Sequence, residues 1–204
     1  MVPGGNHVVL ASRSPQRRAI LEALGVEFVV RAPDFAESER GDAERVAREN
    51  ALGKAAAVER AAGEVVLGVD TVVSLGGQMY GKPADRAQAR DTLCALSGAT
   101  HTVVSGLALL GLDDSPRLTS CATEVSFREL DEPTIEWYLG SGEWRERAGG
   151  YAIQGAGAAL VASIAGDWTN VVGLPVGALL ALHPSLLTAR NNRFNPSEDH
   201  ELQH

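Results

Sequence analysis

Apolar runs and amphipathic stretches alternate along most of the chain. Short runs rich in Val, Leu and Ile predict strands, whereas apolar residues that recur every three or four positions predict helices. The expected strands are His7–Ala11, 26–30, 65–69, 71–75, Gln78–Tyr80, 102–110, 118–127 and 158–164. Because a hairpin around Gly76-Gly77 interrupts the strict alternation of strands and helices, the pattern predicts an α/β fold with a mixed β-sheet.

Capping residues mark the expected helices, because Ser and Asp side chains accept hydrogen bonds from the free N–H groups of a first turn. Ser14 followed by Pro15 predicts a helix that ends at Gly25. The other expected helices run from Asp42 to about 62, from Asp85 to about 97, from Asp131 to 140, and from Pro175 to about 182.

Neither an internal repeat nor a clear linker divides the chain. At 204 residues it is long enough for one large domain or two closely packed lobes. We therefore expect one domain over residues 1–187, followed by a polar tail over 188–204 that is predicted to be disordered.

The composition is that of an acidic globular protein, with a formal net charge of -8 and a pI near 5.1. This acidity argues against a general nucleic-acid-binding protein, which needs a basic surface. No apolar run reaches the roughly 18 residues that cross a bilayer, and the N-terminus lacks the basic residues of a signal peptide. Cys94 and Cys121 form no metal-binding or disulfide pattern, so we expect a cytoplasmic protein.

One acid, Asp70, stands between two strand-like runs in the sequence VLGVDTVVSL. A charge at such a place is costly unless it is solvated, paired or bound to a metal. Asp70 could cap a turn or pair with a lysine. It could also bind Mg²⁺ or take a proton from water, and its place between two strands indicates a residue at a cleft.

A basic turn follows the first expected strand, in the sequence SRSPQRR from Ser12 to Arg18. A strand that leads into a capped helix directs free N–H groups and the positive end of the helix dipole to one place. Arginine also binds phosphate with two hydrogen bonds. The turn is therefore either a cradle for a triphosphate or a capped surface helix with solvated arginines; no P-loop or dinucleotide fingerprint is present.

Two lysines could add positive charge to a phosphate site. Lys54 lies on the helix expected from 42 to 62, where a lysine is more often a solvated surface residue. Lys82 lies between Gly81 and Pro83, which restrict the backbone, so its ammonium could serve as a fixed point charge.

Further polar residues are weaker candidates. Gln154, in the glycine-rich sequence AGGYAIQGAG, could read the edge of a base, or it could be an incidental residue of a connection. One of the acids Asp34, Glu37 and Glu39 could complete a metal site, although solvated loop charge is the plainer interpretation. His101 is expected to pack or to form a hydrogen bond rather than to bind a ligand.

Six segments, taken in order, resemble the Maf family, the septum-formation-protein relatives that act as nucleoside triphosphate pyrophosphatases. These segments are LASRSPQRRAILEALGV, GVDTVV, GKP, LSGATHTVVSGLAL, SGEWRERAGGYAIQG and NVVGLPV. They cover about residues 8–180, and six matches in the same order are specific although each alone is weak.

The resemblance implies an elongated mixed β-sheet flanked by helices, with two lobes and a deep cleft, as in Maf and ITPase-like folds, often in a homodimer. It implies a house-cleaning hydrolase that acts on an acid anhydride. Such an enzyme cleaves a nucleoside triphosphate between the α- and β-phosphates, releases a monophosphate and pyrophosphate, and uses Mg²⁺ or Mn²⁺.

The resemblance also implies roles for individual residues. Asp70 falls at the position of the general base and of a metal ligand, and Glu37 falls where an acid assists the metal. The residues implied to bind the triphosphate are Ser12, Arg17, Lys54 and Lys82. Those tied to the choice of base are Gln16, Thr71 and Gln154, and the Thr/Gln combination resembles the branch that prefers dTTP and UTP.

One position departs from the family pattern. The usual SPRR reads Ser14-Pro15-Gln16-Arg17 here, so Gln16 replaces an arginine linked to specificity. We expect this change to affect the substrate preference, which could include modified nucleotides. The charged residues that the reaction needs are present.

Charge balance suggests a mechanism in which cationic side chains and a divalent cation neutralise the triphosphate while Asp70 deprotonates the attacking water. Two other functions stay open. The first is a nucleotide-binding regulator of cell division that acts by contact with a partner and without turnover. The second is a nucleic-acid-binding protein that uses the basic turn, which the acidity of the chain disfavours.

Overall fold

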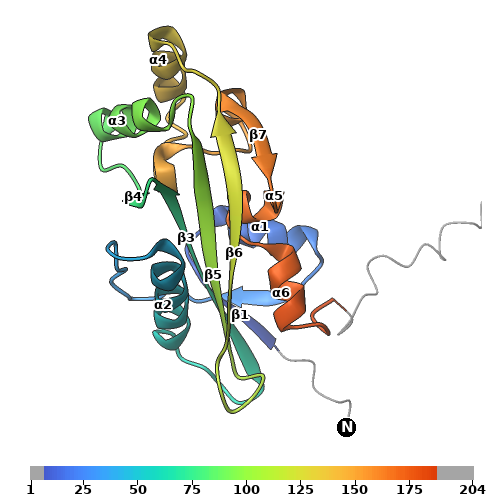
Figure 1. The fold of residues 1–204 in the computed structure, drawn as a ribbon. Helices are drawn as coiled ribbons and strands as arrows, with labels where there is room; N and C mark the ends of the chain where they lie inside the picture. Colours follow the sequence, from blue (N-terminus) through green and yellow to red (C-terminus); the bar gives the residue numbers. More distant parts are fainter. Residues whose placement is uncertain (1–6, 188–204) are drawn as a thin grey trace, which may run out of the picture.

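The computed structural model describes residues 7–187 of the chain. The polar tail expected over 188–204 lies outside the described residues. Figure 1 shows an elongated molecule in which long central strands run between two groups of helices.

A mixed sheet of seven strands forms the centre of the molecule, in the order β2-β1-β3-β5-β6-β7, with β4 paired to β3 (Figure 1). The strands are β1 (His7–Ala11), β2 (Phe28–Val30), β3 (Glu64–Leu75), β4 (Gln78–Tyr80), β5 (Thr100–Leu110), β6 (Arg117–Phe127) and β7 (Val161–Ala165). Strand β1 is parallel to β2 and β3, whereas the other pairs are antiparallel. The predicted α/β fold with a mixed sheet is confirmed.

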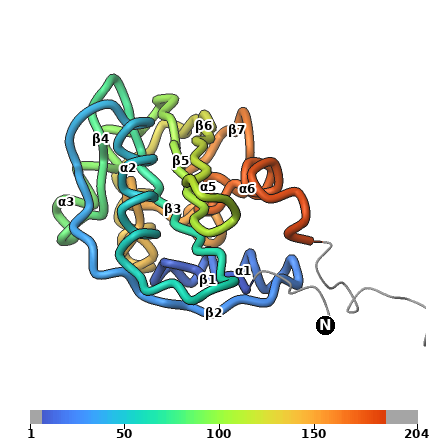
Figure 2. Tube along the Cα trace, turned by 90° about the horizontal axis from the view of Figure 1, so that it is seen from below, coloured from blue at the N-terminus to red at the C-terminus, as the bar shows by residue number. Residues whose placement is uncertain are grey.

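Helices cover both faces of this sheet. Figure 2 shows α2 (Ala43–Ala56) on one side of β3 and β5 and α6 (Val176–Leu182) on the other. The remaining helices are α1 (Pro15–Ala23), α3 (Arg86–Leu96), α4 (Glu132–Ser141), α5 (Trp168–Val172) and the 3₁₀-helices η1 (Ala148–Gly150) and η2 (Ala156–Leu160).

Buried side chains divide the molecule into two lobes that share the long strands. Val73, Leu93 and Tyr138 belong to the core beside α3 and α4, here called the upper lobe. Leu67 and Leu107 belong to a separate core beside α1 and α6, and together with the α2 face this region is called the lower lobe. Because β3 contributes Leu67 to one core and Val73 to the other, the segment between them lies at the junction of the lobes.

Two glycines bring α2 unusually close to the sheet. A Cβ atom at Gly68 on β3 would lie 2.1 Å from the carbonyl oxygen of Ala51, and one at Gly106 on β5 would lie 2.2 Å from that of Ala47. Real Cβ atoms do not approach so closely, so only glycine permits this packing. The polar side chains of α2 are thereby brought next to the middle of β3.

The largest difference from the sequence prediction is in β3. Two strands were expected on either side of Asp70, but one strand runs through it from Glu64 to Leu75. The strand is continuous because Asp70 is paired with Gly106 of β5, and because side chains from α2 satisfy its carboxylate. The expectation that Asp70 interrupts the sheet is wrong.

Several predicted boundaries also shift. Helix α2 ends at Ala56 rather than near 62, because residues 57–63 turn back toward β3 and the Glu64 carboxylate accepts the N–H of Ala61. Helix α4 continues through Gly140 and ends at Ser141, and it is followed by the C-cap residue Gly142, which has a left-handed φ of 73°. The strand expected over 158–164 begins only at Val161, after η2. Strand β2 is limited to Phe28–Val30, and α5 was not predicted.

Candidate active site

A cleft opens where β3 has no neighbouring strand on one edge. Strand β1 accompanies β3 only as far as the pair Ala11 and Gly68, and β4 begins to pair with it at Val73. Between these points Asp70, Thr71 and Val72 line the cleft, which has a volume of about 1000 Å³. The site therefore lies at the junction of the two lobes.

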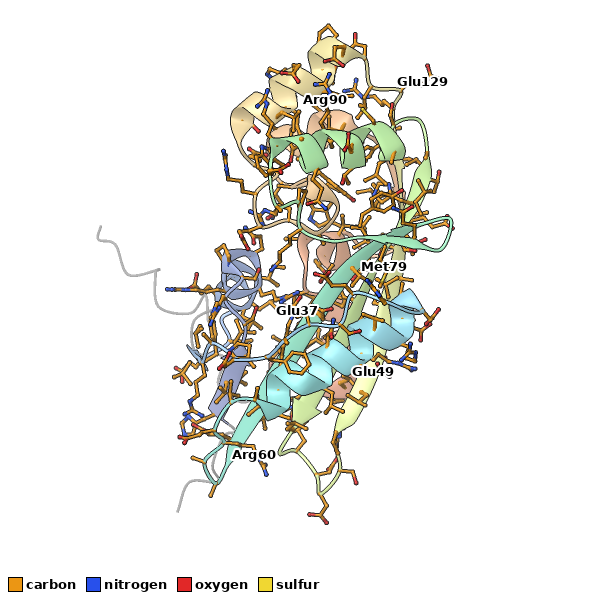
Figure 3. The ribbon with its side chains drawn as sticks, turned by 90° about the vertical axis from the view of Figure 1, so that its left-hand side faces the viewer. Glu37, Glu49, Arg60, Met79, Arg90 and Glu129 are labelled. Atoms are coloured by element: carbon orange, nitrogen blue, oxygen red, sulfur yellow. The ribbon has the colours of Figure 1, made fainter. Side chains whose placement is uncertain are left out.

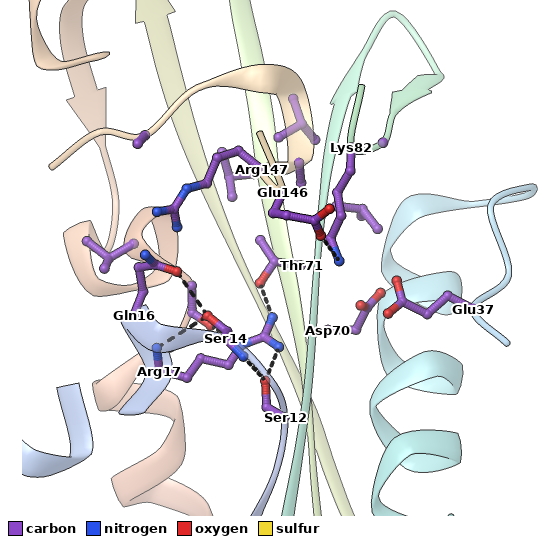
Figure 4. A pocket seen from close by; sticks show the side chains of 18 of the residues that line it. Ser12, Ser14, Gln16, Arg17, Glu37, Asp70, Thr71, Lys82, Glu146 and Arg147 are labelled. Atoms are coloured by element: carbon purple, nitrogen blue, oxygen red, sulfur yellow. Dashed lines mark hydrogen bonds and ion pairs between the residues drawn. The ribbon is translucent and has the colours of Figure 1, made fainter. Parts of the chain in front are cut away.

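Nine residues were predicted from the sequence to act as the general base, to bind the metal or the triphosphate, or to select the nucleobase. All nine line this one cleft. They are Ser12, Gln16, Arg17, Glu37, Lys54, Asp70, Thr71, Lys82 and Gln154. Among the weaker acids, Glu39 also lines it whereas Asp34 does not. Figure 4 shows the turn after β1 on one wall, with Lys82 and Arg147 on the other.

Asp70 is the most enclosed acid of the cleft, with only 3% of its surface exposed. Its Oδ1 accepts a hydrogen bond of 2.5 Å from Lys54 Nζ, and its Oδ2 accepts one of 3.0 Å from Asn50 Nδ2. Lys54 and Asn50 are one helical turn apart, so they present their side chains to β3 from the same face of α2. Each carboxylate oxygen has two lone pairs, so each can still accept a further hydrogen bond.

Lys54 is shared between two acids. Its Nζ atom lies 2.5 Å from Asp70 and 2.8 Å from Glu37 Oε1, and 7% of the residue is exposed. An ammonium group has three N–H donors, so one is left for another acceptor. The interpretation of Lys54 as a solvated surface residue is wrong, because the close approach of α2 to the sheet buries it.

Glu37 reaches the cleft from the segment between β2 and α2. Figure 3 shows it at the level of the cleft, between α2 below and Met79 of the β3–β4 hairpin above. Its side chain is partly exposed, unlike that of Asp70. The two carboxylates therefore share one ammonium, that of Lys54. Figure 4 shows the side chains of Asp70 and Glu37 facing each other.

Arg17 lies on the opposite side of β3 from Lys54. Because successive side chains of a strand point to opposite faces, Asp70 points toward α2 and Thr71 points toward α1 (Figure 4). Arg17 donates hydrogen bonds to Ser12 Oγ at 3.0 Å, Thr71 Oγ1 at 3.1 Å and the carbonyl oxygen of Gly173 at 2.9 Å. Burial lowers the pKa of this guanidinium, and the charges of Asp70 and Glu37 oppose that shift.

The turn after β1 is organised by short hydrogen-bonded side chains. Ser14 caps α1 by accepting from Arg17 N–H, as the sequence predicts, and it also donates to Gln16 Oε1 at 3.2 Å. Ser12 Oγ accepts from Ser14 N–H as well as from Arg17. Gln16 is half-buried, and Figure 4 shows it on the wall opposite Arg147.

The charged side chains on the wall formed by Lys82 and Arg147 are more exposed than Asp70 and Lys54. Lys82 Nζ lies 3.8 Å from Glu146 Oε2, and both side chains are largely in solvent, so this pair contributes little stability. Arg145 and Arg147 of the same loop line the cleft, as does the exposed Gln154.

His101 lies in the upper lobe, away from the cleft lining. Its Nε2 atom is 2.9 Å from the hydroxyl of Tyr151, and its ring packs edge-on against Phe127 and Tyr151. Burial lowers its pKa to about 4, so the ring is neutral at pH 7. The prediction of a packing and hydrogen-bonding histidine is confirmed.

Three residues that line the cleft were not predicted from the sequence: Asn50, Glu146 and Arg147. Asn50 had a detectable signal, because it lies four positions before Lys54 and between apolar positions of one helix face. A polar residue in an apolar stripe needs a partner, and two of them one turn apart indicate a polar site. Glu146 and Arg147 belong to a loop without periodicity, so no comparable signal marks them.

The structure thus defines a two-lobed α/β protein in which acidic and basic side chains converge on one cleft. The family model described as Maf-like protein matches residues 7–185. The chain belongs to the Maf family.

Relatives in this family are similar over most of the chain. A dTTP/UTP pyrophosphatase from Symbiobacterium thermophilum is 46% identical over 173 residues, covering 83% of this chain and 88% of the relative. Proteins with the same description from Myxococcus xanthus and Pyrococcus furiosus are 44% and 39% identical, each covering 86% of this chain, and 90% and 93% of their own lengths. Among solved structures, a HAM1 protein from Coxiella burnetii aligns with a TM-score of 0.42 and 21% identity, over 60% of this chain and 73% of its own.

No helix within residues 7–187 is both long enough and apolar enough to cross a membrane.

Proposed function

We propose that this protein is a nucleoside triphosphate pyrophosphatase, a hydrolase that cleaves a nucleoside triphosphate into its monophosphate and pyrophosphate. The observation that carries the proposal is the Asp70 carboxylate, buried at a cleft and held by Lys54 and Asn50. Relatives that are 39–46% identical and described as dTTP/UTP pyrophosphatases support it.

Asp70 acts as the general base in this proposal. It accepts the proton of a water molecule that attacks the α-phosphorus, and the bond from that phosphorus to the bridging oxygen of the β-phosphate breaks. Pyrophosphate leaves with the electron pair of that bond. A positioned general base contributes on the order of 10²- to 10⁴-fold to the rate of such a step.

Cationic side chains bind the triphosphate and stabilise the charge that develops on pyrophosphate. Lys54 is suited to this role because one of its donors is left over after its contacts with Asp70 and Glu37. Lys82 is suited because its exposed pair with Glu146 is easily exchanged for a phosphate. Arg17 and Ser12 shape the phosphate-binding turn, where Arg17 keeps further N–H groups beyond its three protein contacts.

Asp70 and Glu37 are the residues that would hold a divalent cation. Within residues 7–187 no group of three or more His, Cys, Asp or Glu side chains could form a metal site by itself. Mg²⁺, however, is usually bound by one or two carboxylates together with substrate phosphates, so these two acids fit a cation that binds with the triphosphate. When bound, Mg²⁺ or Mn²⁺ supplies charge that neutralises the phosphate oxygens.

The choice of base is assigned to Gln16, Thr71 and Gln154, and the relatives support a pyrimidine triphosphate such as dTTP or UTP. Gln16 replaces the arginine of the family pattern, and Arg147 lies on the wall opposite it (Figure 4).

Replacement of Gln154 by Ala should alter the ratio of kcat/KM values between nucleotides more than it alters kcat, because Gln154 is assigned to base selection. An unchanged ratio would remove Gln154 from base selection.

The test is a panel of dTTP, UTP, CTP, GTP and modified nucleotides with purified protein and Mg²⁺ or Mn²⁺. Pyrophosphate and orthophosphate are quantified separately, because only pyrophosphate is expected. Asp70→Asn is assayed in parallel and should lose the activity. Nucleotide binding without turnover across the panel would contradict the proposal and favour a regulator of cell division that acts through a partner.

We also propose that the protein is cytoplasmic, forms a homodimer and does not bind nucleic acid. The acidic net charge of -8 supports the last point. Light scattering at several protein concentrations measures the oligomeric state.

A further inference from the structure

The segment of residues 33–39, here called the strap, runs along α2 without forming a helix or strand of its own. It carries Glu37 and lines the cleft together with α2. An irregular segment has no backbone ladder to hold it, so its position depends on side-chain contacts. Two such contacts flank Glu37.

The first contact is between Asn50 of α2 and the backbone of Ser38. Asn50 Oδ1 accepts the N–H of Ser38 at 2.8 Å, and Asn50 Nδ2 donates to the carbonyl oxygen of Ser38 at 3.0 Å. The amide of Asn50 therefore binds a peptide unit on each side of Ser38, the residue directly after Glu37.

The second contact is between Phe35 and Gly53. A Cβ atom at Gly53 would lie 2.2 Å from the ring of Phe35, so the ring occupies the space that any other residue would fill. Phe35 precedes Glu37 by two positions. The strap is therefore held on both sides of the acid.

The remaining N–H of Asn50 donates to Asp70 Oδ2 at 3.0 Å. Both N–H groups and the carbonyl oxygen of this side chain are thus used, and only 2% of the residue is exposed. An apolar residue at this position would leave the buried Oδ2 of Asp70 and the backbone N–H and carbonyl oxygen of Ser38 without the hydrogen bonds from Asn50.

We propose that Asn50 is a positioning residue that couples the strap to Asp70. One amide orients the Asp70 carboxylate and, through Ser38, places Glu37 on the other side of the Lys54 ammonium. The inference rests on the proposed function, in which Asp70 and Glu37 act on one substrate. It adds a residue that sets the relative position of the two acids.

Two variants separate the two halves of this coupling. Asn50→Asp keeps an acceptor for Ser38 N–H but loses the donors to Asp70 and to the Ser38 carbonyl oxygen, and it places a second carboxylate beside Asp70. Gly53→Ala leaves the bond to Asp70 intact but forces the Phe35 ring away from α2. Glu49→Ala, at an exposed position of the same helix, is the matched control. Asn50→Ala, which removes all three hydrogen bonds of the side chain, is tested as well.

Steady-state kinetics give the first readout. Asn50→Asp should lower kcat at least about tenfold, since it disturbs the general base itself. Gly53→Ala should leave kcat within about threefold and should raise the Mg²⁺ concentration for half-maximal rate about fivefold, the equivalent of one typical hydrogen bond. Glu49→Ala should match the wild type in both quantities.

Limited trypsin digestion gives a second readout that needs neither metal nor substrate. Arg40 is exposed directly after the strap, and cleavage after it reports release of the strap from α2. The rate of cleavage after Arg40 should rise about fivefold in Gly53→Ala and in Asn50→Ala, but not in Glu49→Ala.

Identical cleavage rates in the wild type and these three variants would overturn the contact between the strap and α2. A wild-type kcat in both Asn50→Asp and Asn50→Ala would overturn the coupling to Asp70. A wild type without turnover would instead overturn the proposed function, while the digestion would still decide how the strap is held.

Discussion

At the scale of single residues, the site depends on one enclosed carboxylate and the ammonium beside it. Asp70 and Lys54 are both buried, and their charged atoms are 2.5 Å apart. Removal of one partner from such a pair is costly, because the other charge is then left without compensation. Lys54 therefore has two proposed tasks, which are to stabilise the fold around Asp70 and to supply positive charge to the substrate.

Replacement of Asp70 by Asn should separate catalysis from folding. Asn keeps the shape of the side chain but cannot accept a proton from water, so kcat should fall on the order of 10²- to 10⁴-fold. Asp91→Asn, which makes the same change at an exposed position of α3, is the control and should keep full activity. If Asp70→Asn retains a kcat within about threefold of the wild type, Asp70 is not the base.

Replacement of Lys54 by Met should cost about 3–5 kcal/mol in the free energy of unfolding, because it leaves the buried Asp70 carboxylate without its cationic partner. The double variant Lys54→Met/Asp70→Asn should lose less than the sum of the two single variants. Urea titrations of all four proteins measure this difference. Simple additivity would show that the pair is not coupled.

At the scale of secondary-structure elements, the packing of α2 on the sheet determines where the polar residues of α2 lie. Gly68 and Gly106 permit this contact. Gly68 lies on β3, the strand that carries Asp70, and Gly106 lies on β5 and is paired with Asp70. A helix held farther from the sheet would move Asn50 and Lys54 away from the carboxylate that they contact.

Gly106→Ala should therefore reduce both stability and activity. The added methyl group would meet the backbone of α2 at 2.2 Å, and such overpacking typically costs about 1–3 kcal/mol in unfolding free energy. Gly140→Ala in α4 is the matched control, because nothing lies within 4 Å of its added methyl group. Gly140 lies in the last turn of α4, where alanine is at least as favourable as glycine, so this change should not destabilise the protein and should leave turnover unchanged. Equal effects of the two substitutions would contradict the role given to the close packing of α2.

At the scale of the whole molecule, stability should depend on pH through His101. This residue joins β5 to Tyr151 and to Phe127 of β6 inside the core of the upper lobe. Its pKa is about 4 in the folded protein and 6.5 in the unfolded reference, so the unfolded chain binds more protons between these values. The free energy of unfolding should therefore fall as the pH is lowered through this window.

The contribution of His101 can be isolated with His101→Phe. From pH 7 to pH 5 the wild type should lose about 2 kcal/mol of unfolding free energy more than the variant, given the folded pKa of about 4. Urea titrations at both pH values measure the two losses. If the wild type and the variant lose the same amount, His101 does not titrate in the predicted way.

Local signals were enough to predict most of the elements. The caps Ser14, Asp42, Asp85 and Asp131 each accept a backbone N–H of the first helical turn, as expected. The prediction failed at Asp70, because a charge in an apolar run was interpreted as an interruption. The groups that make a continuous strand possible lie on α2, 16 and 20 positions earlier in the chain.

The composition of the cleft was also largely predictable, whereas its internal contacts were not. The resemblance to the Maf family implied residues such as Lys82 and Gln154, which line the cleft. The role of Asn50 follows only from the distances between three separate segments, which no local pattern encodes. The same is true of the contacts of Arg17, which crosses from α1 to Thr71 and Gly173.

The most direct test of the account is hydrolysis in water enriched in ¹⁸O, with the best nucleotide of the panel and analysis of both products by mass spectrometry. In the proposed reaction water attacks the α-phosphorus, so the label should appear in the nucleoside monophosphate and be absent from pyrophosphate. Label in pyrophosphate, or release of orthophosphate as the first product, would contradict it.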